Sequence, residues 1–111
     1  MESESAILAL AALAQPTRLE VFRLLVRYEP EGRPAGAIAE AVGVPANTLS
    51  SHLAVLARAG LATSERRSRS IIYRADLEGL RAVVLFLLKD CCGGRADICA
   101  PLLAELAPCC D

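Results

Sequence analysis

The stretch that decides the fold is residues 35–74, which read AGAIAEAV GV PANTLSSHLAVLARAG LATSERRSRSIIYR. Apolar residues recur at helical spacing on both sides of Gly43-Val44, so we expect two short helices, 35–42 and 45–59, joined by a tight turn. Pro45 suits the start of the second helix, where its missing N–H leaves no hydrogen bond unmade. This succession predicts a helix-turn-helix unit.

The second helix of this unit has an apolar side and a polar side. Leu49, Leu53 and Leu56 form a stripe that we expect to be buried. The other side carries short hydrogen-bonding side chains, where an ordinary surface helix usually carries Lys and Glu. Such side chains suit base edges and phosphates, although an ordinary solvated helix is the competing interpretation. The expected DNA contacts are Asn47, Thr48, Ser50, Ser51 and His52.

The period of the apolar residues changes after this helix. Residues 61–65 and 70–73 are expected to form two strands, and 66–69 the polar tip of the hairpin between them. Residues 58–74 hold five Arg against one Glu, a local charge of +4 that leaves −5 for the rest of the chain. A basic hairpin beside a helix-turn-helix suits contact with phosphates or the minor groove, whereas the alternative is a solvated loop. The expected contacts are Arg66, Arg67 and Arg69, with Arg58 and Arg74 completing the basic set.

The flanking segments are expected to be helical. The first helix, 4–14, has Ile7, Leu8, Leu10 and Leu13 as its apolar positions, and the second, 16–28, carries Leu19, Phe22 and Val26 along one stripe. A loop is expected over 29–34 and a last helix over 77–92. The predicted fold class is therefore mainly α with a small β-hairpin wing, in a domain of residues 1–92 followed by a cysteine-rich tail, 93–111.

Composition limits the class of protein. A chain of 111 residues with 54% hydrophobic and 23% charged residues forms one core and is not generally disordered. The net charge of −1 excludes a generally basic coat. The longest apolar run, 82–88, is far shorter than the roughly 20 residues of a membrane-spanning helix. The N-terminus carries acidic residues where an export signal would carry basic ones, so we expect a cytoplasmic protein without membrane association.

Residues 6–90 resemble the ArsR/SmtB family of bacterial metal-responsive repressors. The resemblance lies in the stretches 13–25, 47–53 and 56–61, which include Ser-x-His-Leu and Ala-Gly-Leu, followed by an Arg-rich wing and Tyr73. It implies a winged helix-turn-helix homodimer, packed through its first and last helices on a palindromic double-stranded operator. An apolar stripe on the last helix agrees with this, because it would otherwise be exposed: Leu80, Val83, Val84 and Leu87.

All five cysteines lie in the last 21 residues. In a cytoplasmic chain, clustered thiols indicate a soft metal or redox sensing rather than disulfide bonds. Family members also place ligands elsewhere, but the helix 35–42 here has no thiol and the last helix has no His, so those sites are not expected. The sensing site is therefore predicted at the end of the last helix and in the tail.

Cys91, Cys92 and Cys99 are the predicted inducer ligands. Cys91 continues the apolar face of the last helix, and the Gly93-Gly94 turn lets the chain return to bring Cys99 alongside. Three thiolates without an imidazole suit As(III) or Sb(III) better than Zn²⁺, which usually takes four ligands, and no organic cofactor is expected. Cys109 and Cys110 form a possible second thiol pair, and either could replace Cys99.

These features predict a repressor that binds operator DNA when ligand-free and dissociates when trivalent arsenic binds its cysteines. The first alternative keeps the repressor and changes the signal to oxidants or to Cd²⁺ and Hg²⁺. The second is a metal-binding buffer protein that does not bind DNA. An enzyme is not expected, because the lone His has no catalytic partner in the sequence around it.

Overall fold

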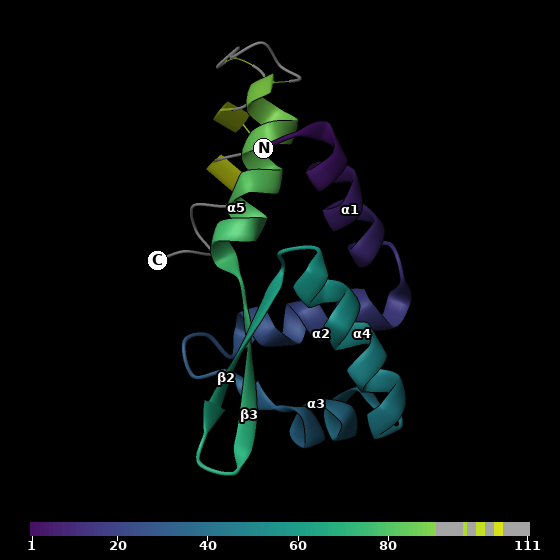
Figure 1. The fold of residues 1–111 in the computed structure, drawn as a ribbon. Helices are drawn as coiled ribbons and strands as arrows, with labels where there is room; N and C mark the ends of the chain where they lie inside the picture. The colour runs from purple at the N-terminus through teal and green to yellow at the C-terminus, as the bar shows by residue number, and fades with distance from the viewer. Residues whose placement is uncertain (91–96, 98–99, 102–103, 106–111) are drawn as a thin grey trace.

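The computed structural model describes residues 1–90, 97, 100–101 and 104–105, and the fold class is as predicted: mainly helical, with a small antiparallel sheet that forms a wing (Figure 1). The strand order in the sheet is β1-β3-β2. The helices are α1 (Ser3–Leu13), α2 (Pro16–Arg27), α3 (Ala35–Val42), α4 (Ala46–Arg58), α5 (Leu77–Leu85) and the π-helical η1 (Phe86–Asp90); the strands are β1 (Arg33–Pro34), β2 (Ala62–Arg67) and β3 (Ser70–Ala75).

Local chemistry explains where several helices begin and end. Pro16 is the first residue of α2, and the side chain of Gln15 caps that helix by accepting a hydrogen bond from a backbone N–H of its first turn. Gly43 ends α3 with a φ of 72°, the left-handed conformation that glycine adopts most readily, and so makes the turn into α4. Asp76 caps α5 through a bond from the Gly79 N–H.

The core lies where α2, α3, α4 and the start of β2 meet. Leu49, Leu53 and Leu56 are buried as predicted, and they fix which side of α4 is left for solvent. None of the described polar or charged residues is buried. The largest fully buried side chains are Val21, Leu25, Ile38, Leu49, Leu53, Leu56 and Leu61.

The face of α1 toward the core is made of alanines. Ala6, Ala9 and Ala12 are buried, whereas Ile7 is 65% and Leu8 52% exposed. Alanine allows a close approach of backbones, so Ile7, Leu8 and Leu10 point away from the core, and of the predicted positions Leu13 packs against it. The expected stripe of α2 is also wrong in part, because Leu19 and Val26 are exposed and the buried positions are Val21, Phe22, Leu24 and Leu25.

The wing is longer than expected and gains a third strand. β2 and β3 pair from Ala62↔Ala75 to Arg67↔Ser70, so Arg66 and Arg67 lie in β2 and the tip is only Ser68-Arg69 rather than 66–69. A two-residue connection matches the twist of a hairpin better than a four-residue one. The expected loop 29–34 ends in β1, which pairs with β3.

The last helix differs from its prediction in two ways. It is α-helical only to Leu85 and continues as η1 to Asp90, and the remainder of the predicted span lies outside the described residues. Val83 is buried and Leu80 packs against the core, so these two do not form the exposed stripe. Val84 is half-buried, and the exposed large apolar side chains in the described part of this helix are Leu77, Leu85 and Leu87. The predicted boundary between 1–92 and the tail also lies outside the described residues.

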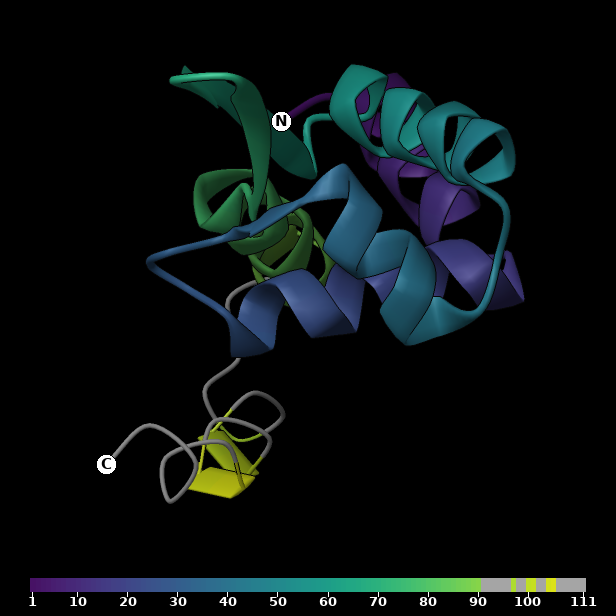
Figure 2. The same cartoon turned by 90° about the horizontal axis from the view of Figure 1, so that it is seen from below.

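Within the described part of the chain, no helix is long and apolar enough to cross a membrane. The arrangement instead separates two regions. α1 and α5 contact each other at one end of the molecule, and the wing and α3 lie at the other (Figure 1). Seen from below, α4 and the β2–β3 hairpin lie along one edge, with α2 on the opposite side of the molecule (Figure 2).

Candidate nucleic-acid interface

The polar side of α4 is open to solvent. Asn47, Thr48, Ser50 and Ser51 are all exposed. The Asn47 Oδ1 accepts a hydrogen bond from the Thr48 N–H at 3.0 Å, and the Ser51 hydroxyl donates to the Asn47 carbonyl at 3.4 Å. The fold therefore gathers four of the five predicted contacts of this helix on one surface as short donors and acceptors.

His52, the fifth predicted contact, is half-buried beside that surface. The Nη1 of Arg18 lies 3.4 Å from its Nδ1, and the Nε of the same guanidinium donates to the Ala12 carbonyl at 2.7 Å. Arg18 thus joins the end of α1 to α4. Sequence reasoning missed it, because a residue 34 positions away along the chain gives no local signal of this contact.

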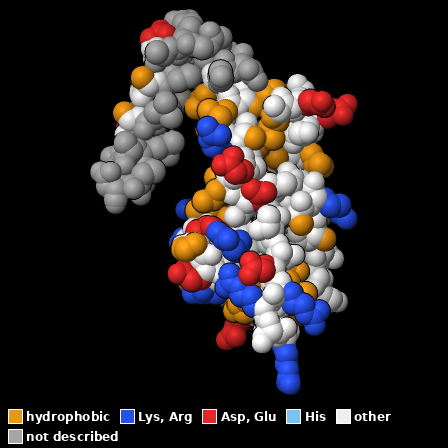
Figure 3. All heavy atoms as spheres, turned by 60° about the vertical axis from the view of Figure 1, so that its left-hand side comes forward, with side chains coloured by type: hydrophobic (Ala, Val, Ile, Leu, Met, Phe, Trp, Pro, Cys, Tyr) orange, Lys and Arg blue, Asp and Glu red, His pale blue; other side chains and the backbone are white. Residues whose placement is uncertain are grey.

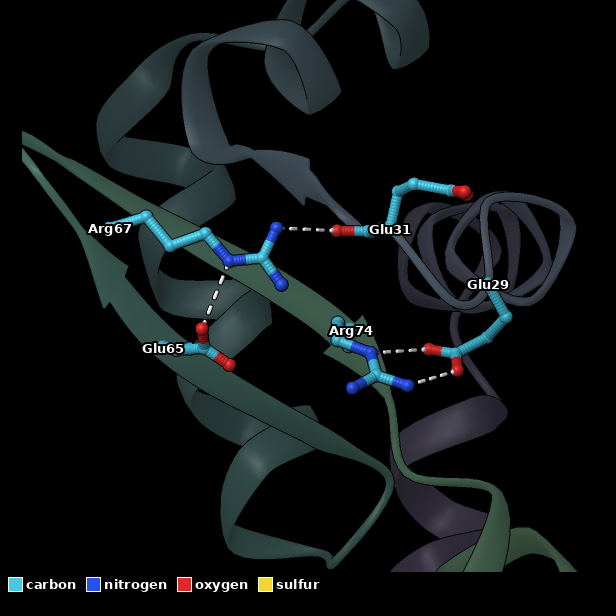
Figure 4. Close-up of polar contacts among 5 residues, drawn as sticks. All are labelled: Glu29, Glu31, Glu65, Arg67 and Arg74. Carbon is cyan, nitrogen blue, oxygen red and sulfur yellow. Dashed lines mark hydrogen bonds and ion pairs between the residues drawn. The ribbon is translucent and has the colours of Figure 1, made fainter.

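The arginines of the wing are not equivalent. The Nε of Arg67 donates to the Glu65 carboxylate at 2.9 Å, and its Nη1 donates to the Glu31 carbonyl at 3.5 Å (Figure 4). The hydrogen bond from Arg67, and then its charge, lower the pKa of Glu65 from its ordinary value. The ion pair therefore stabilises the folded protein at pH values above the ordinary pKa of Glu65. This stabilisation is lost as the pH falls through the lowered pKa that Glu65 has in the folded protein. At neutral pH, Glu65 offsets the charge of Arg67.

Arg74 is also paired. Its Nη2 and Nε donate to the two carboxylate oxygens of Glu29 at 2.7 and 3.1 Å, and the hydrogen bond raises the pKa of Arg74 (Figure 4). This fork joins the turn after α2 to β3. Among the described residues, Arg58, Arg66 and Arg69 have no ion-pair partner and keep their charge free.

The surface agrees with this division. Lys and Arg side chains gather around the hairpin together with acidic ones, and apolar side chains gather toward the other end (Figure 3). The basic patch is therefore smaller in net charge than the count of arginines suggests. α4 and the hairpin that carries Arg66 and Arg69 lie along the same edge of the molecule (Figure 2).

Comparisons with known proteins agree with this geometry. Residues 13–65 match a family profile described as a helix-turn-helix domain. The chain is 30% identical over 90 residues to the HTH-type transcriptional regulator YgaV of Escherichia coli, covering 81% of this chain and 89% of that protein. It is 33% identical over 76 residues to the HTH-type transcriptional repressor SmtB of Mycobacterium tuberculosis, covering 68% of this chain and 54% of SmtB. The chain thus spans about half the length of that relative.

Solved structures show the same fold. An ArsR-like transcriptional regulator from Rhodococcus sp. RHA1 superposes with a TM-score of 0.71 at 27% identity, covering 94% of this chain and 92% of the other. This chain belongs to the ArsR/SmtB family of winged helix-turn-helix transcriptional regulators. A homodimeric winged helix-turn-helix DNA-binding domain from Mycobacterium bovis superposes with a TM-score of 0.65 at 29% identity, and the match covers 74% of this chain and 74% of the other. A protein described as a possible transcriptional regulator for arsenical resistance superposes with a TM-score of 0.62 at 32% identity, and the match covers 68% of this chain and 76% of the other.

Membership of the ArsR/SmtB family supports the prediction that the chain is not an enzyme, since its relatives are transcriptional regulators. Regulators of this family respond to metal or metalloid ligands. The described residues hold no group of three or more His, Cys, Asp or Glu that could bind a metal ion. All predicted thiol ligands, Cys91, Cys92, Cys99, Cys109 and Cys110, lie outside the described residues.

Proposed function

We propose that this chain is a transcriptional repressor that binds operator DNA as a homodimer and releases it when As(III) or Sb(III) binds its C-terminal cysteines. The observation that carries the DNA-binding part is that α4, whose polar side chains are exposed, lies along the same edge as the hairpin that carries Arg66 and Arg69 (Figure 2). Family membership supports it, since this side of the fold is where winged helix-turn-helix proteins meet DNA.

Each surface has a distinct part in the proposed complex. α4 enters the major groove, where Asn47, Ser50 and their neighbours reach base edges and phosphates. Arg66 and Arg69 contact phosphates beside the groove, because no carboxylate of the described residues offsets their charge. Arg67 contributes less than the sequence suggests while it is paired with Glu65.

The homodimer is supported by apolar side chains that one protomer leaves uncovered. Four large apolar side chains are each at least 40% exposed: Ile7 and Leu8 on α1, Leu85 at the end of α5, and Leu87 on η1. α1 contacts α5, so these side chains belong to one end of the molecule. A second copy that covers this end removes apolar surface from water, and the M. bovis neighbour is homodimeric.

The choice of inducer rests on the chemistry of the donor set. Cys91 and Cys92 follow η1 directly, and with Cys99 or a thiol of the Cys109-Cys110 pair they offer three soft ligands to a trivalent ion. The solved relative described as a possible regulator for arsenical resistance supports the same class of ligand. For full induction the ion must favour the DNA-free form by about 5.5 kcal/mol, the difference that moves an equilibrium from 1:99 to 99:1.

The deciding experiment is fluorescence anisotropy of the protein on the DNA upstream of its own gene, titrated with As(III), Sb(III), Cd²⁺ and Zn²⁺ under reducing conditions. We expect release by As(III) and Sb(III) that Cys91→Ser abolishes. Cys99→Ser and the double change Cys109→Ser/Cys110→Ser then identify the third ligand. DNA binding that none of the ions affects would reject the inducer and leave the repressor with oxidants as its signal.

A charge control separates the repressor from a metal-buffer protein. Arg66→Gln/Arg69→Gln removes free cations from the wing, and the salt dependence of binding should become shallower by about 0.9 for each phosphate that the wing no longer neutralises. Arg27→Gln removes an exposed charge from the last turn of α2, outside α4 and the β2–β3 hairpin, and should leave DNA affinity nearly unchanged. A wild-type protein that binds no DNA at low salt would favour the buffer.

A further inference from the structure

We propose that Arg18 is a positioning residue that holds His52 in the tautomer with its proton on Nε2, and that this N–H donates to an acceptor on DNA. The inference rests on the proposed DNA-binding function. It assigns a direction to one hydrogen bond of the interface and gives a role to a residue on α2 that the sequence did not indicate.

The first step is the anchoring of Arg18. Its backbone N–H donates to the Gln15 side chain at 2.7 Å, and its Nε donates to the Ala12 carbonyl at 2.7 Å. Both partners belong to the end of α1 and the turn into α2, so the guanidinium is fixed from one side. Its Nη1 is then directed toward α4, 3.4 Å from the Nδ1 of His52.

The second step follows from the chemistry of the two groups. A guanidinium has only donors, and a neutral imidazole has one donor and one acceptor nitrogen. Nδ1 of His52 faces Arg18, so Nδ1 must be the acceptor and the ring proton sits on Nε2.

The third step is the exposure of Nε2. Among the described residues, the His52 ring has a side-chain hydrogen bond to Arg18 alone, and no described side-chain nitrogen or oxygen is buried without a partner. Nε2 therefore reaches solvent, on the helix whose polar side holds Asn47 and Ser51. An outward N–H fits acceptors: a phosphate oxygen or, in the major groove, O6 and N7 of guanine, N7 of adenine and O4 of thymine. It does not fit the amino groups of adenine or cytosine.

The tautomer is tested without DNA. His52 is the single histidine of the chain, so a two-dimensional ¹H–¹⁵N spectrum of the ring in tag-free protein at mildly alkaline pH reports on this residue alone. We expect the Nε2–H form in the wild type and a mixture of both tautomers in Arg18→Met. A wild-type ring that is mostly Nδ1–H would overturn the proposal.

The DNA contact is tested on the tightest duplex selected from a random-sequence library. Gln places its amide nitrogen near the position of Nε2, whereas Asn places its amide near Nδ1. His52→Gln should therefore keep affinity within about threefold, and His52→Asn should lose roughly tenfold, the scale of one hydrogen bond to DNA. Equal affinity of His52→Asn and wild type would reject the inference while leaving DNA binding intact; no binding by the wild type would reject the proposed function itself.

A double-mutant cycle separates positioning from a general structural role. Arg18→Met should weaken DNA binding roughly tenfold when residue 52 is His and by less than about twofold in the His52→Asn background. The same loss in both backgrounds would show that Arg18 does not act through His52. If Arg18→Met does not fold, Arg18→Lys takes its place in the cycle. Lysine keeps the charge and the aliphatic part of the side chain, but it lacks the guanidinium that reaches the Ala12 carbonyl and His52 at the same time.

The source of the acceptor is found by interference on the same duplex. Replacing one purine at a time by its 7-deaza analogue removes N7, and ethylating one phosphate at a time removes its charge. The position that weakens the wild type but not His52→Asn identifies the partner of Nε2. A set of positions identical for the two proteins would count against any contact from this ring.

Discussion

Gly79→Ala is expected to destabilise the protein, although helix propensity predicts the opposite. Gly79 is the third residue of α5. A Cβ at this position would overlap the carbonyl oxygen of Gly60 and lie 2.9 Å from its carbonyl carbon. The obstacle is backbone at the end of α4, which cannot rotate away as a side chain could. Either the first turn of α5 or the end of α4 has to move.

The expected size follows from what such a movement breaks. Close to Gly79, the Asp76 N–H donates to the Leu61 carbonyl at 2.9 Å, a bond whose loss costs about 1 kcal/mol. Overpacking a tight site costs about 1–3 kcal/mol. The higher helix propensity of alanine stabilises the folded protein by about 1 kcal/mol relative to glycine and so offsets part of this cost. The net change is a loss of roughly 1–3 kcal/mol in the free energy of unfolding, or about 4–8 °C in Tm for each kcal/mol in a small domain.

Gly36→Ala is the matched control. Gly36 lies in α3 and is exposed, and a Cβ at this position would meet nothing within 4 Å. The free energy of unfolding of the Gly36→Ala protein should be unchanged or higher by up to about 1 kcal/mol. The measurement is urea and thermal unfolding followed by far-ultraviolet circular dichroism at one protein concentration, because dimerisation makes Tm depend on concentration. A Gly79→Ala protein as stable as Gly36→Ala would refute the steric argument.

Three further changes test individual interactions. Glu65→Gln should release Arg67, raising DNA affinity and making its salt dependence steeper by about 0.9; electrophoretic titrations at several salt concentrations would show it, and an unchanged slope would mean that Arg67 faces no phosphate. Glu29→Gln breaks the two hydrogen bonds with Arg74 and should lower Tm at low salt by more than at about 1 M salt, where the ion pair is screened. An equal loss of Tm at low and at high salt would contradict an electrostatic contribution of this pair. Asp76→Ala removes the cap of α5 and should cost about 1 kcal/mol in urea unfolding, so a neutral result would contradict the cap.

The parts of the fold that local pattern determines could be predicted from the sequence. The stripe of Leu49, Leu53 and Leu56 and the glycine turn before it fix the helix-turn-helix, and both are as expected. Which side of α1 faces the core could not be predicted, because a helix of alanines and leucines has apolar residues all round. The alanines occupy that side through a close approach of backbones that only tertiary packing reveals.

The candidate site shows the same limit. The exposed positions of α4 follow from its period, but the charge available in the wing depends on pairings across the fold. Glu29 and Arg74 are 45 residues apart, and Arg18 and His52 are 34 apart. A count of arginines treats them as equal, whereas Arg74 is paired with a carboxylate and Arg66 has no ion-pair partner in the part of the chain that the structure describes. Long-range partners are what the sequence alone does not supply.

α4 is held at two points, through Arg18 to the end of α1 and through Gly60 to α5, and α1 and α5 carry the exposed apolar end. Near its middle, His52 contacts Arg18, which is bonded to the end of α1. Just beyond its C-terminal end, the carbonyl of Gly60 lies against the first turn of α5 at Gly79. Because the second contact joins backbone to backbone without space for a methyl group, α5 cannot move toward α4 without moving the end of that helix. A signal that displaces the last helix therefore needs no intervening element to reach the surface that we propose meets DNA.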